Sequence, residues 1–433
     1  MRTRTPLPLV ILTLALIPGP GRAAEDAVET AALRHVFVTS ATGTGDLSTW
    51  TDSGSLDDIA GANQVCHARA EAAGLATAGA PEFRAWISNS TTDAWCNVQG
   101  LTGRRFLVPA CDGGVLTTVG PWVRTDGTLF ADSLSQLVSG GPYVPVAFDE
   151  SGAGVAGVLK HFTATGDTGS ASSFHCTGWS TTTGNATVGS DLGTADWTTS
   201  SPTSPCATAA RLLCLELGQG VPVAKPSAPG HLVFVSSTSG TGDLDSWADA
   251  GGQVGIAAGD AICQARAATA RLPVPASFHV WLSDTANDAA CRVRGQTGLV
   301  AGGCDGVTPA LDAPYRRIDG FVLASSFADL TDALLSTSIS VNELGNGVFA
   351  NVWTGSTAAG TLAPNGTCSE WQDGTNGSTT EFGRSDRTDG KWSLNGSTIC
   401  SATSRIFCVG AAVADFWDDF ESGSFARWTA TSP

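Results

Sequence analysis

Acidic and amide side chains recur at matching places in two glycine-rich stretches of the sequence. The first reads Phe148-Asp-Glu-Ser-Gly152 and the second reads Val341-Asn-Glu-Leu-Gly345. The candidate ligand-binding residues, which carry side-chain oxygens, are Asp149, Glu150, Asn342 and Glu343. Of these, Glu150 and Glu343 are the candidate calcium ligands. Calcium takes about six to eight oxygens, so these residues could form only part of a site. A solvated acidic loop is the simpler interpretation.

Four tryptophans stand near cysteines, again at matching places. They are Trp179, Trp197, Trp371 and Trp392. Two of them follow a cysteine by three positions, and the other two precede the next cysteine by nine and eight positions. If exposed on loops, such rings could stack on a sugar or anchor a protein partner. If packed against a disulfide, they would instead supply core to a loop-rich domain.

Histidines and common catalytic motifs give no support for an enzyme. Of the six histidines, only His35 and His231 stand at comparable places in the two halves of the chain. A catalytic histidine would be expected in both halves unless one had decayed. The sequence also lacks HExxH, GxSxG and phosphate-binding-loop patterns. We therefore expect a non-enzymatic protein.

The twelve cysteines divide into two sets of six with similar spacing. The first set is Cys66, Cys96, Cys111, Cys176, Cys206 and Cys214, and the second is Cys263, Cys291, Cys304, Cys368, Cys400 and Cys408. An even number of cysteines at repeated spacing, in a chain that begins with the export signal described below, is typical of a disulfide framework. Zinc is the competing interpretation, but the sequence has no Cys-x-x-Cys pair or Cys/His cluster with ligand spacing.

The N-terminus and the charge balance indicate export. Residues 1–23 have the basic start, short apolar run and small-residue exit of a secretory signal peptide. The apolar run is far shorter than the roughly 20 residues of a membrane span, so we expect no transmembrane segment in the mature chain. A formal net charge of −17 argues against nucleic-acid partners, because phosphate backbones repel an acidic chain. The expected location is secreted or at the cell surface.

The same unit, about 180 residues long, is present twice, which defines the domains. His35-Val-Phe-Val-Thr-Ser40 returns as Leu232-Val-Phe-Val-Ser-Ser237, and the cysteine spacing fixes the alignment. The assigned parts are domain 1 at 35–216, a Pro- and Gly-rich linker at 217–230, domain 2 at 231–410 and an acidic-aromatic tail at 411–433. Linkers of this composition allow two domains to move independently.

Each domain should belong to the α+β class. Val36–Val38 is a β-branched and aromatic run typical of a strand. Residues 58–73 carry apolar side chains at helical spacing, and Gly74 stands where a left-handed residue would end the helix. Phe83–Ser88 alternates like a second strand. Long stretches of Gly, Ser, Thr and Asn then predict extended loops.

These features together resemble the C-type-lectin-like fold, specifically its endostatin-like bacterial branch. The resemblance rests on a cysteine-bearing helix, the core-strand dipeptides Trp86-Ile and Trp281-Leu, and the closing strands Leu212–Glu216 and Ile406–Val409. It covers both domains and implies a helix or two, a small antiparallel sheet, long loops and three disulfides in each. The implied pairs are Cys66–Cys214, Cys96–Cys111, Cys176–Cys206, Cys263–Cys408, Cys291–Cys304 and Cys368–Cys400.

The resemblance also carries an expectation of function. Calcium-dependent lectins of this fold usually hold ion and sugar with Glu-Pro-Asn or Gln-Pro-Asp followed by Trp-Asn-Asp, and neither motif is present. We expect a protein that binds a glycan or an extracellular-matrix-like protein through its loops, with calcium as the one candidate cofactor. A structural or adhesive envelope protein without a small ligand is the alternative, and an enzyme on the same scaffold is a third.

Overall fold

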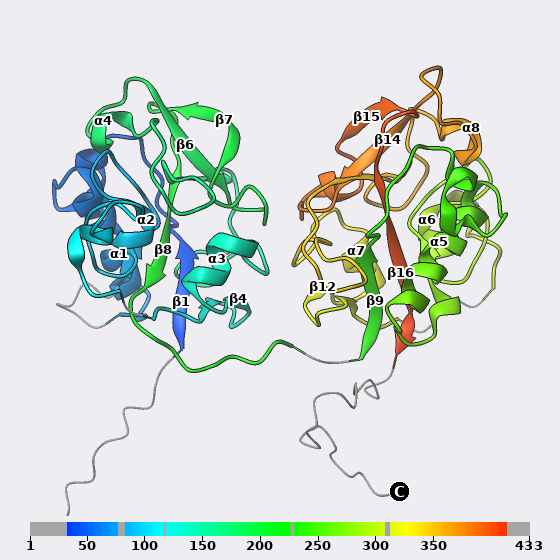
Figure 1. The fold of residues 1–433 in the computed structure, drawn as a ribbon, viewed down its shortest axis with the longest axis horizontal. Helices are drawn as coiled ribbons and strands as arrows, with labels where there is room; N and C mark the ends of the chain where they lie inside the picture. The colour runs from blue at the N-terminus through cyan, green and yellow to red at the C-terminus, as the bar shows by residue number, and fades with distance from the viewer. Residues whose placement is uncertain (1–32, 77–82, 117, 227–228, 308–311, 414–433) are drawn as a thin grey trace, which may run out of the picture.

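A computed structural model describes residues 33–76, 83–116, 118–226, 229–307 and 312–413 of the chain. The predicted signal peptide lies outside the described residues, as does the predicted tail from residue 414 onward. Within the described ranges, each copy of the repeat forms one mixed sheet of eight strands with helices around it (Figure 1). No helix in these ranges is long and apolar enough to cross a membrane.

The two copies contain the same succession of elements. The strands of copy 1 are β1 (Arg34–Val38), β2 (Phe83–Ala85), β3 (Trp122–Arg124), β4 (Leu129–Ala131), β5 (Lys160–Phe162), β6 (Asn185–Ser190), β7 (Ser200–Pro205) and β8 (Arg211–Glu216). Its helices are α1 (Asp58–Ala72), α2 (Ala94–Asn97), α3 (Leu134–Gly140) and α4 (Cys176–Trp179).

Copy 2 follows in the same order. Its strands are β9 (Gly230–Val235), β10 (His279–Val280), β11 (Tyr315–Arg317), β12 (Val322–Ala324), β13 (Asn351–Trp353), β14 (Thr379–Arg384), β15 (Gly396–Ile399) and β16 (Arg405–Val413). Its helices are α5 (Gly255–Thr269), α6 (Ala289–Arg292), α7 (Phe327–Leu330) and α8 (Cys368–Trp371).

The closing strand lies at the centre of each sheet. In copy 1 the strand order is β4-β3-β1-β8-β5-β6-β7, and β2 also pairs with β8. The pairing of β8 is antiparallel with β1 and β2 and parallel with β5. In copy 2 the order is β12-β11-β9-β16-β13-β14-β15, with β10 paired to β16. The last strand of each copy therefore joins the start and the middle of that copy.

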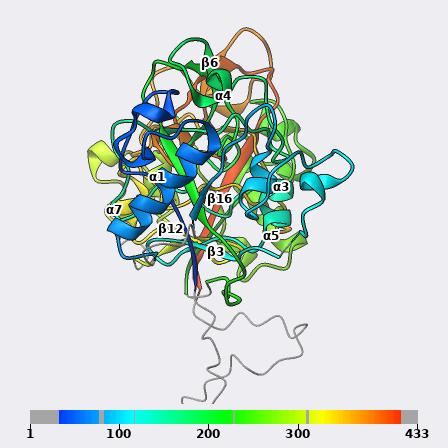
Figure 2. The same cartoon turned by 90° about the vertical axis from the view of Figure 1, so that its left-hand side faces the viewer.

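Both faces of these central strands are covered, so their sequences are apolar throughout. On one face of the sheet Phe37 and Leu212 belong to a core cluster with the apolar side of α1. On the other face Val38 and Leu213 belong to a cluster that includes residues of α3. Strands buried on both faces read as continuous apolar runs, as Leu212–Leu215 does. Figure 2 shows α1 and α3 on opposite sides of copy 1.

The first strand and the long helix are confirmed as predicted, but β2 ends at Ala85 rather than Ser88, and the expected small antiparallel sheet is a mixed sheet of eight strands with parallel pairs. The strand expected at Val36–Val38 is β1, and the helix expected over residues 58–73 is α1. Ile59, Ala62 and Cys66 recur at helical spacing on the buried side of α1. Gly74 follows the helix with a φ of 75°, a left-handed conformation that costs glycine little.

All six implied disulfides are present with the implied pairing. Cys66–Cys214 and Cys263–Cys408 join the long helix of each copy to its closing strand, across 148 and 145 residues. The other four close loops of 13 to 32 residues. The described residues contain no free cysteine.

The copies differ in how the long helix holds the neighbouring short strand. In copy 1 the Asn63 carbonyl accepts from the N–H of Ala85 at 2.9 Å, and its amide donates to Asn97. In copy 2 Asp260 accepts from the N–H of Val280 at 2.9 Å and pairs with Arg292. One copy thus uses neutral amides where the other uses an ion pair.

The disulfides should differ in their contribution to stability according to the length of chain that they close. We expect the double substitution Cys66→Ala/Cys214→Ala to lower the free energy of unfolding by about 5 kcal/mol, and Cys96→Ala/Cys111→Ala by about 3 kcal/mol, because the longer loop loses more entropy on closure. Urea unfolding followed by tryptophan fluorescence measures both. A larger loss from the 15-residue loop would contradict this ranking.

Acid should destabilise copy 2 through Asp260. Burial alone would raise the pKa of Asp260, but the hydrogen bond from His279 and the charge of Arg292 lower it below the usual value. A carboxyl with a lowered folded pKa stabilises the fold above its unfolded pKa of about 3.9 and loses that contribution as the pH falls through the folded value. We expect Asp260→Asn/Arg292→Asn, which copies the amide pair of copy 1, to reduce the difference in unfolding free energy between pH 7 and pH 3. An unchanged difference would show that this carboxylate is not the acid-sensitive group.

Candidate functional site

The two loop glutamates are buried hydrogen-bond acceptors. Glu150 accepts from the backbone N–H of Ser40 at 2.8 Å and from the Ser40 hydroxyl. Glu343 accepts from the N–H of Ser237 at 2.9 Å and from the Ser237 hydroxyl. Only 7% and 3% of these glutamates are exposed, so their carboxylates are not solvated as predicted, although loop residues beside them such as Ser151 and Leu344 are exposed. Each carboxylate ties its loop to the segment after the first strand of its copy.

Asp149 and Asn342 cap their own turns. The Asp149 carboxylate accepts from the backbone N–H groups two and four residues further on, at 2.9 and 3.0 Å. The Asn342 side chain makes the same two bonds, both 3.0 Å long. The four predicted ligand residues thus hold the two loops in shape. Within the described part of the chain, no group of three or more His, Cys, Asp or Glu side chains is placed to hold a metal ion.

The four tryptophans are core residues. Each is at most 4% exposed, so the prediction that Trp179, Trp197, Trp371 and Trp392 face a ligand is wrong. Trp179 and Trp371 donate their indole N–H to buried backbone carbonyls at 2.8 and 2.9 Å. Trp197 and Trp392 each pack against the tryptophan that follows the second strand of their copy, with ring centroids 5.0 Å apart. The packing interpretation is the one that the burial supports.

The two copies meet through equivalent loops, residues 192–194 and 386–388. Two backbone hydrogen bonds of 3.3 Å join the loops around an antiparallel bridge between Gly193 and Arg387. Because equivalent segments run in opposite directions, an approximate twofold axis relates the copies. The first long helices, α1 and α5, lie on the outer sides, and α3 and α7 lie on the inner sides (Figure 1). This contact is at odds with the expectation that the domains move independently.

Polar side chains extend the contact between the copies. Arg387 forms an ion pair with Asp196 at 3.3 Å, and the hydroxyls of Thr194 and Ser338 share a hydrogen bond of 2.8 Å. Burial raises the pKa of Asp196 and nearby Asp386 adds to the rise, whereas Arg387 opposes it. A carboxylate desolvated in this way is costly without a cation. Arg387 is therefore the charge on which this part of the interface depends.

A column of four side chains also crosses the interface. Phe321 of copy 2 stacks on Tyr143 of copy 1, with ring centroids 5.2 Å apart and planes inclined by 24°. The Lys225 ammonium of the linker lies 4.3 Å from the Tyr143 ring centroid, and the Arg317 guanidinium lies 5.0 Å from that of Phe321. The contact of exposed Lys225 with its ring adds about 0.5–1 kcal/mol, whereas Arg317 is buried. The column joins copy 1, the linker and copy 2.

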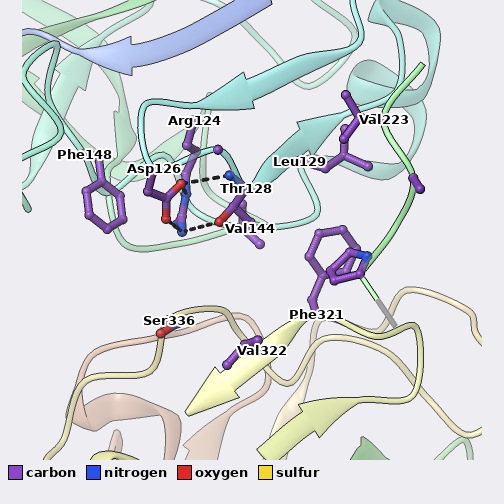
Figure 3. Close-up of a pocket in the computed structure, with 13 residues that line it drawn as sticks. Arg124, Asp126, Thr128, Leu129, Val144, Phe148, Val223, Phe321, Val322 and Ser336 are labelled. Carbon is purple, nitrogen blue, oxygen red and sulfur yellow. Dashed lines mark hydrogen bonds and ion pairs between the residues drawn. The ribbon is translucent and has the colours of Figure 1, made fainter. Parts of the chain in front are cut away.

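A cavity of about 380 Å³ lies where the two copies and the linker meet (Figure 3). Its lining residues are Arg124, Asp126, Gly127, Thr128, Leu129, Val144 and Phe148 of copy 1, Val223, Ala224 and Pro226 of the linker, and Phe321, Val322 and Ser336 of copy 2. Figure 3 shows Phe321 between Leu129 and Val322, with the Arg124–Asp126 pair at the other end. A cavity of roughly 150 Å³ accepts one benzene ring, so this one has room for one or two rings.

The cavity lies where the twofold counterpart of the Tyr143–Phe321 pair would be. Tyr143 and Ser336 occupy equivalent positions. The backbone N–H of each donates, at 2.8 Å, to the carbonyl of the middle residue of the fourth strand of its copy, β4 or β12. Thr128 and Phe321 also occupy equivalent positions, because the backbone carbonyl of each accepts a hydrogen bond from the backbone N–H of the arginine four residues before it. One side of the axis therefore has two aromatic rings, and the other side has Thr128 and Ser336, which line the cavity. The cavity is the space that the smaller pair leaves.

An ion pair forms the polar end of the cavity. Buried Arg124 donates to both oxygens of Asp126 at 3.2 and 2.6 Å, and its guanidinium lies 4.6 Å from the Phe148 ring centroid. Burial lowers the pKa of Arg124; burial also acts to raise that of Asp126, but Arg124 outweighs this and lowers it. Asp126 thus remains a carboxylate, and its side chain is 28% exposed. It can accept hydrogen bonds from hydroxyl groups or a cation, while the remaining walls offer mainly apolar contact.

Comparison with known proteins gives one family over part of copy 2. A family described as "Protein of unknown function (DUF1554)" matches residues 247–388. The match includes α5, the β11–β12 hairpin and the loop that meets copy 1. No curated protein matches the chain.

The cavity residues were not among the sites predicted from the sequence. Asp126-Gly127 and Asp319-Gly320 stand out as a repeated pair, but such pairs are most simply turns. A better signal is a size change between aligned copies, as in Tyr143 against Ser336. Such a change marks positions where equivalent surfaces no longer have equivalent neighbours.

The contact between the copies should depend on Arg387. We expect Arg387→Ala to leave Asp196 desolvated without its partner, weaken the pairing and broaden the distribution of distances between the copies. Small-angle X-ray scattering of the whole chain measures this as an increased maximum dimension. Arg266→Ala is the matched control, because its ion pair with Asp249 lies within copy 2. Equal scattering profiles for Arg387→Ala and the control would contradict the assigned role.

Proposed function

We propose that this protein is an exported, non-enzymatic binding protein in which two C-type-lectin-like domains hold an extracellular ligand, a glycan or a protein, at the cavity between them. The proposal rests on one observation: a single cavity takes its walls from both copies and from the linker. Ligand sites are commonly found at domain interfaces, with mainly apolar walls and a few polar groups that orient the ligand. The volume of about 380 Å³ lies within the range of about 300–1,000 Å³ usual for such sites.

The chemistry of the walls suits binding a ring with hydroxyl groups or a side chain. Phe148, Val223 and Val322 offer partly exposed apolar surface, and Asp126, Thr128 and Ser336 offer oxygens. Because the nitrogens of Arg124 already donate to Asp126 and to the Pro145 carbonyl, the free polar capacity is mainly that of acceptors. We therefore favour ligands that donate hydrogen bonds over anionic ligands.

The buried acid–base pair of copy 1 supports a non-enzymatic role. His161 has no exposed surface, and its Nδ1 lies 2.6 Å from Asp191. Its Nε2 lies 2.8 Å from the carbonyl oxygen of Trp197. Both ring nitrogens therefore have internal partners, and the ring is out of reach of a substrate. The pair secures the base of the loop that meets copy 2.

A second candidate role is an adhesive or structural protein of the cell envelope. It is favoured by an exposed apolar loop in copy 1, between Arg104 and Ala110. Such a surface suits contact with another macromolecule better than enclosure of a small ligand.

A glycan and matrix-protein array tests the proposed function. We expect the whole chain to be retained on a subset of spots, and Ser336→Trp to reduce the apparent affinity at least about tenfold, because Ser336 is an exposed cavity residue and indole would fill the space. Ala268→Trp, on the exposed side of α5, is the matched control and should bind as the unmodified chain does.

The same array, run with calcium and with a chelator, tests the cofactor. We expect equal retention, because Glu150 and Glu343 are engaged by serines. No retention on any spot, or retention that Ser336→Trp leaves unchanged, would refute the cavity as the binding site. Loss of retention with the chelator would instead show that binding requires calcium.

A further inference from the structure

The loop Arg104-Arg-Phe-Leu-Val-Pro-Ala110, here called the apolar loop, exposes three consecutive apolar residues. Phe106, Leu107 and Val108 are 67%, 63% and 99% exposed. Val115 and Leu116, a few residues later, are also exposed. Single exposed apolar residues are ordinary, but a contiguous group marks a contact surface.

Copy 2 shows that the fold does not require these residues. The disulfide around the apolar loop spans 15 residues, and its counterpart in copy 2 spans 13. The anchors match, because the N–H of Arg105 donates to Asp93 at 2.7 Å and the N–H of Val300 donates to Asp288 at 2.8 Å. The two extra residues therefore lie after Arg105, in the exposed apolar part. The same substructure closes in copy 2 without them.

The apolar loop is held rigidly in its exposed position. The Cys96–Cys111 disulfide closes its base. The Arg105 guanidinium lies 3.8 Å from the Trp95 ring centroid and 4.9 Å from that of Phe106, and it donates to the Thr168 carbonyl. A preorganised loop loses little entropy on binding, and Trp, Arg and Phe side chains are enriched among residues that dominate binding energy.

We propose that the apolar loop of one molecule inserts into the interdomain cavity of a second copy of this chain. This rests on the proposed function, since it names a partner for the same cavity. The apolar side chains of the loop match Phe148, Val223 and Val322, the partly exposed apolar residues of the cavity walls. Arg104 is already paired with Asp93 at 3.0 Å, so Arg105 is the cation that the loop brings to a partner whose net charge is −17 and whose cavity has the Asp126 carboxylate at one end.

Charge also decides the form of the assembly. Two apolar loops facing each other would bring their arginines together, which disfavours a symmetric loop-to-loop dimer. Loop into cavity is a head-to-tail contact between different surfaces, and such contacts continue into chains unless they close into a ring. A lipid surface is the less favoured partner, because the apolar group is small and the acidic chain is repelled by anionic headgroups.

Sedimentation velocity of the whole chain tests the proposal. We expect oligomers that grow with concentration, and no growth at the same concentrations for either Phe106→Ser/Leu107→Ser or Ser336→Trp. Each change should shift the midpoint of association at least about tenfold. An equimolar mixture of the two variants should form dimers and nothing larger, because one intact loop and one intact cavity remain. Ala268→Trp should assemble as the unmodified chain does.

A second loop variant distinguishes loss of the intermolecular contact from misfolding of the first variant. Replacing Arg104–Ala110 by the corresponding Leu299–Gly303 of copy 2 uses a sequence that already closes this disulfide, and it should also abolish growth. A monomeric unmodified chain, or a mixture of variants that stays monomeric, would overturn the proposal. Array retention sensitive to Ser336→Trp together with a monomeric chain would leave the proposed function intact and remove only this inference. Assembly through the loop and the cavity without retention on the array would support this inference and would refute the proposal that the cavity binds a glycan or a matrix protein.

Discussion

The pairing of the closing strand with the first strand is the constraint on which each copy depends. In copy 1, β8 takes hydrogen bonds from β1, β2 and β5, and Cys214 fastens it to the long helix α1. Because residues of β8 are buried on both faces, the two core clusters of the copy meet at this strand. The loops have little regular structure of their own, so they keep their shape through this centre and through the shorter disulfides.

This dependence explains which parts of the fold could be predicted from the sequence. The strand β1 and the helix α1 have patterns that are complete within a few residues, and both were predicted. The duplication and the cysteine spacing predicted two domains, although β9 begins at Gly230 and β16 ends at Val413, outside the predicted bounds of 231–410. The family resemblance implied the disulfide pairing that the structure contains. Most of what was predicted correctly therefore rests on local periodicity or on cysteines.

The candidate site was predicted poorly because its residues acquire their roles only when distant segments meet. Glu150 has the composition of a calcium ligand, but its partner is Ser40, which is 110 positions away in the sequence. Trp197 could equally stack on a sugar or fill a core, and only the burial of its ring against Trp86 decides between them. The cavity is harder still, since its walls come from three separate parts of the chain. No local pattern marks such a site.

Duplication followed by divergence accounts for a cavity on one side of the approximate twofold axis. Two identical copies would place identical pairs on both sides of that axis, either two aromatic stacks or two gaps. Here Tyr143 and Phe321 fill one side and hold the copies together, while Thr128 and Ser336 leave the other side open. The insertion in the apolar loop breaks the symmetry a second time, because only copy 1 has it. The cavity and the apolar loop are thus two differences between the copies that lie at the surface or the interface, whereas the central strands and the disulfides are shared and hold the fold.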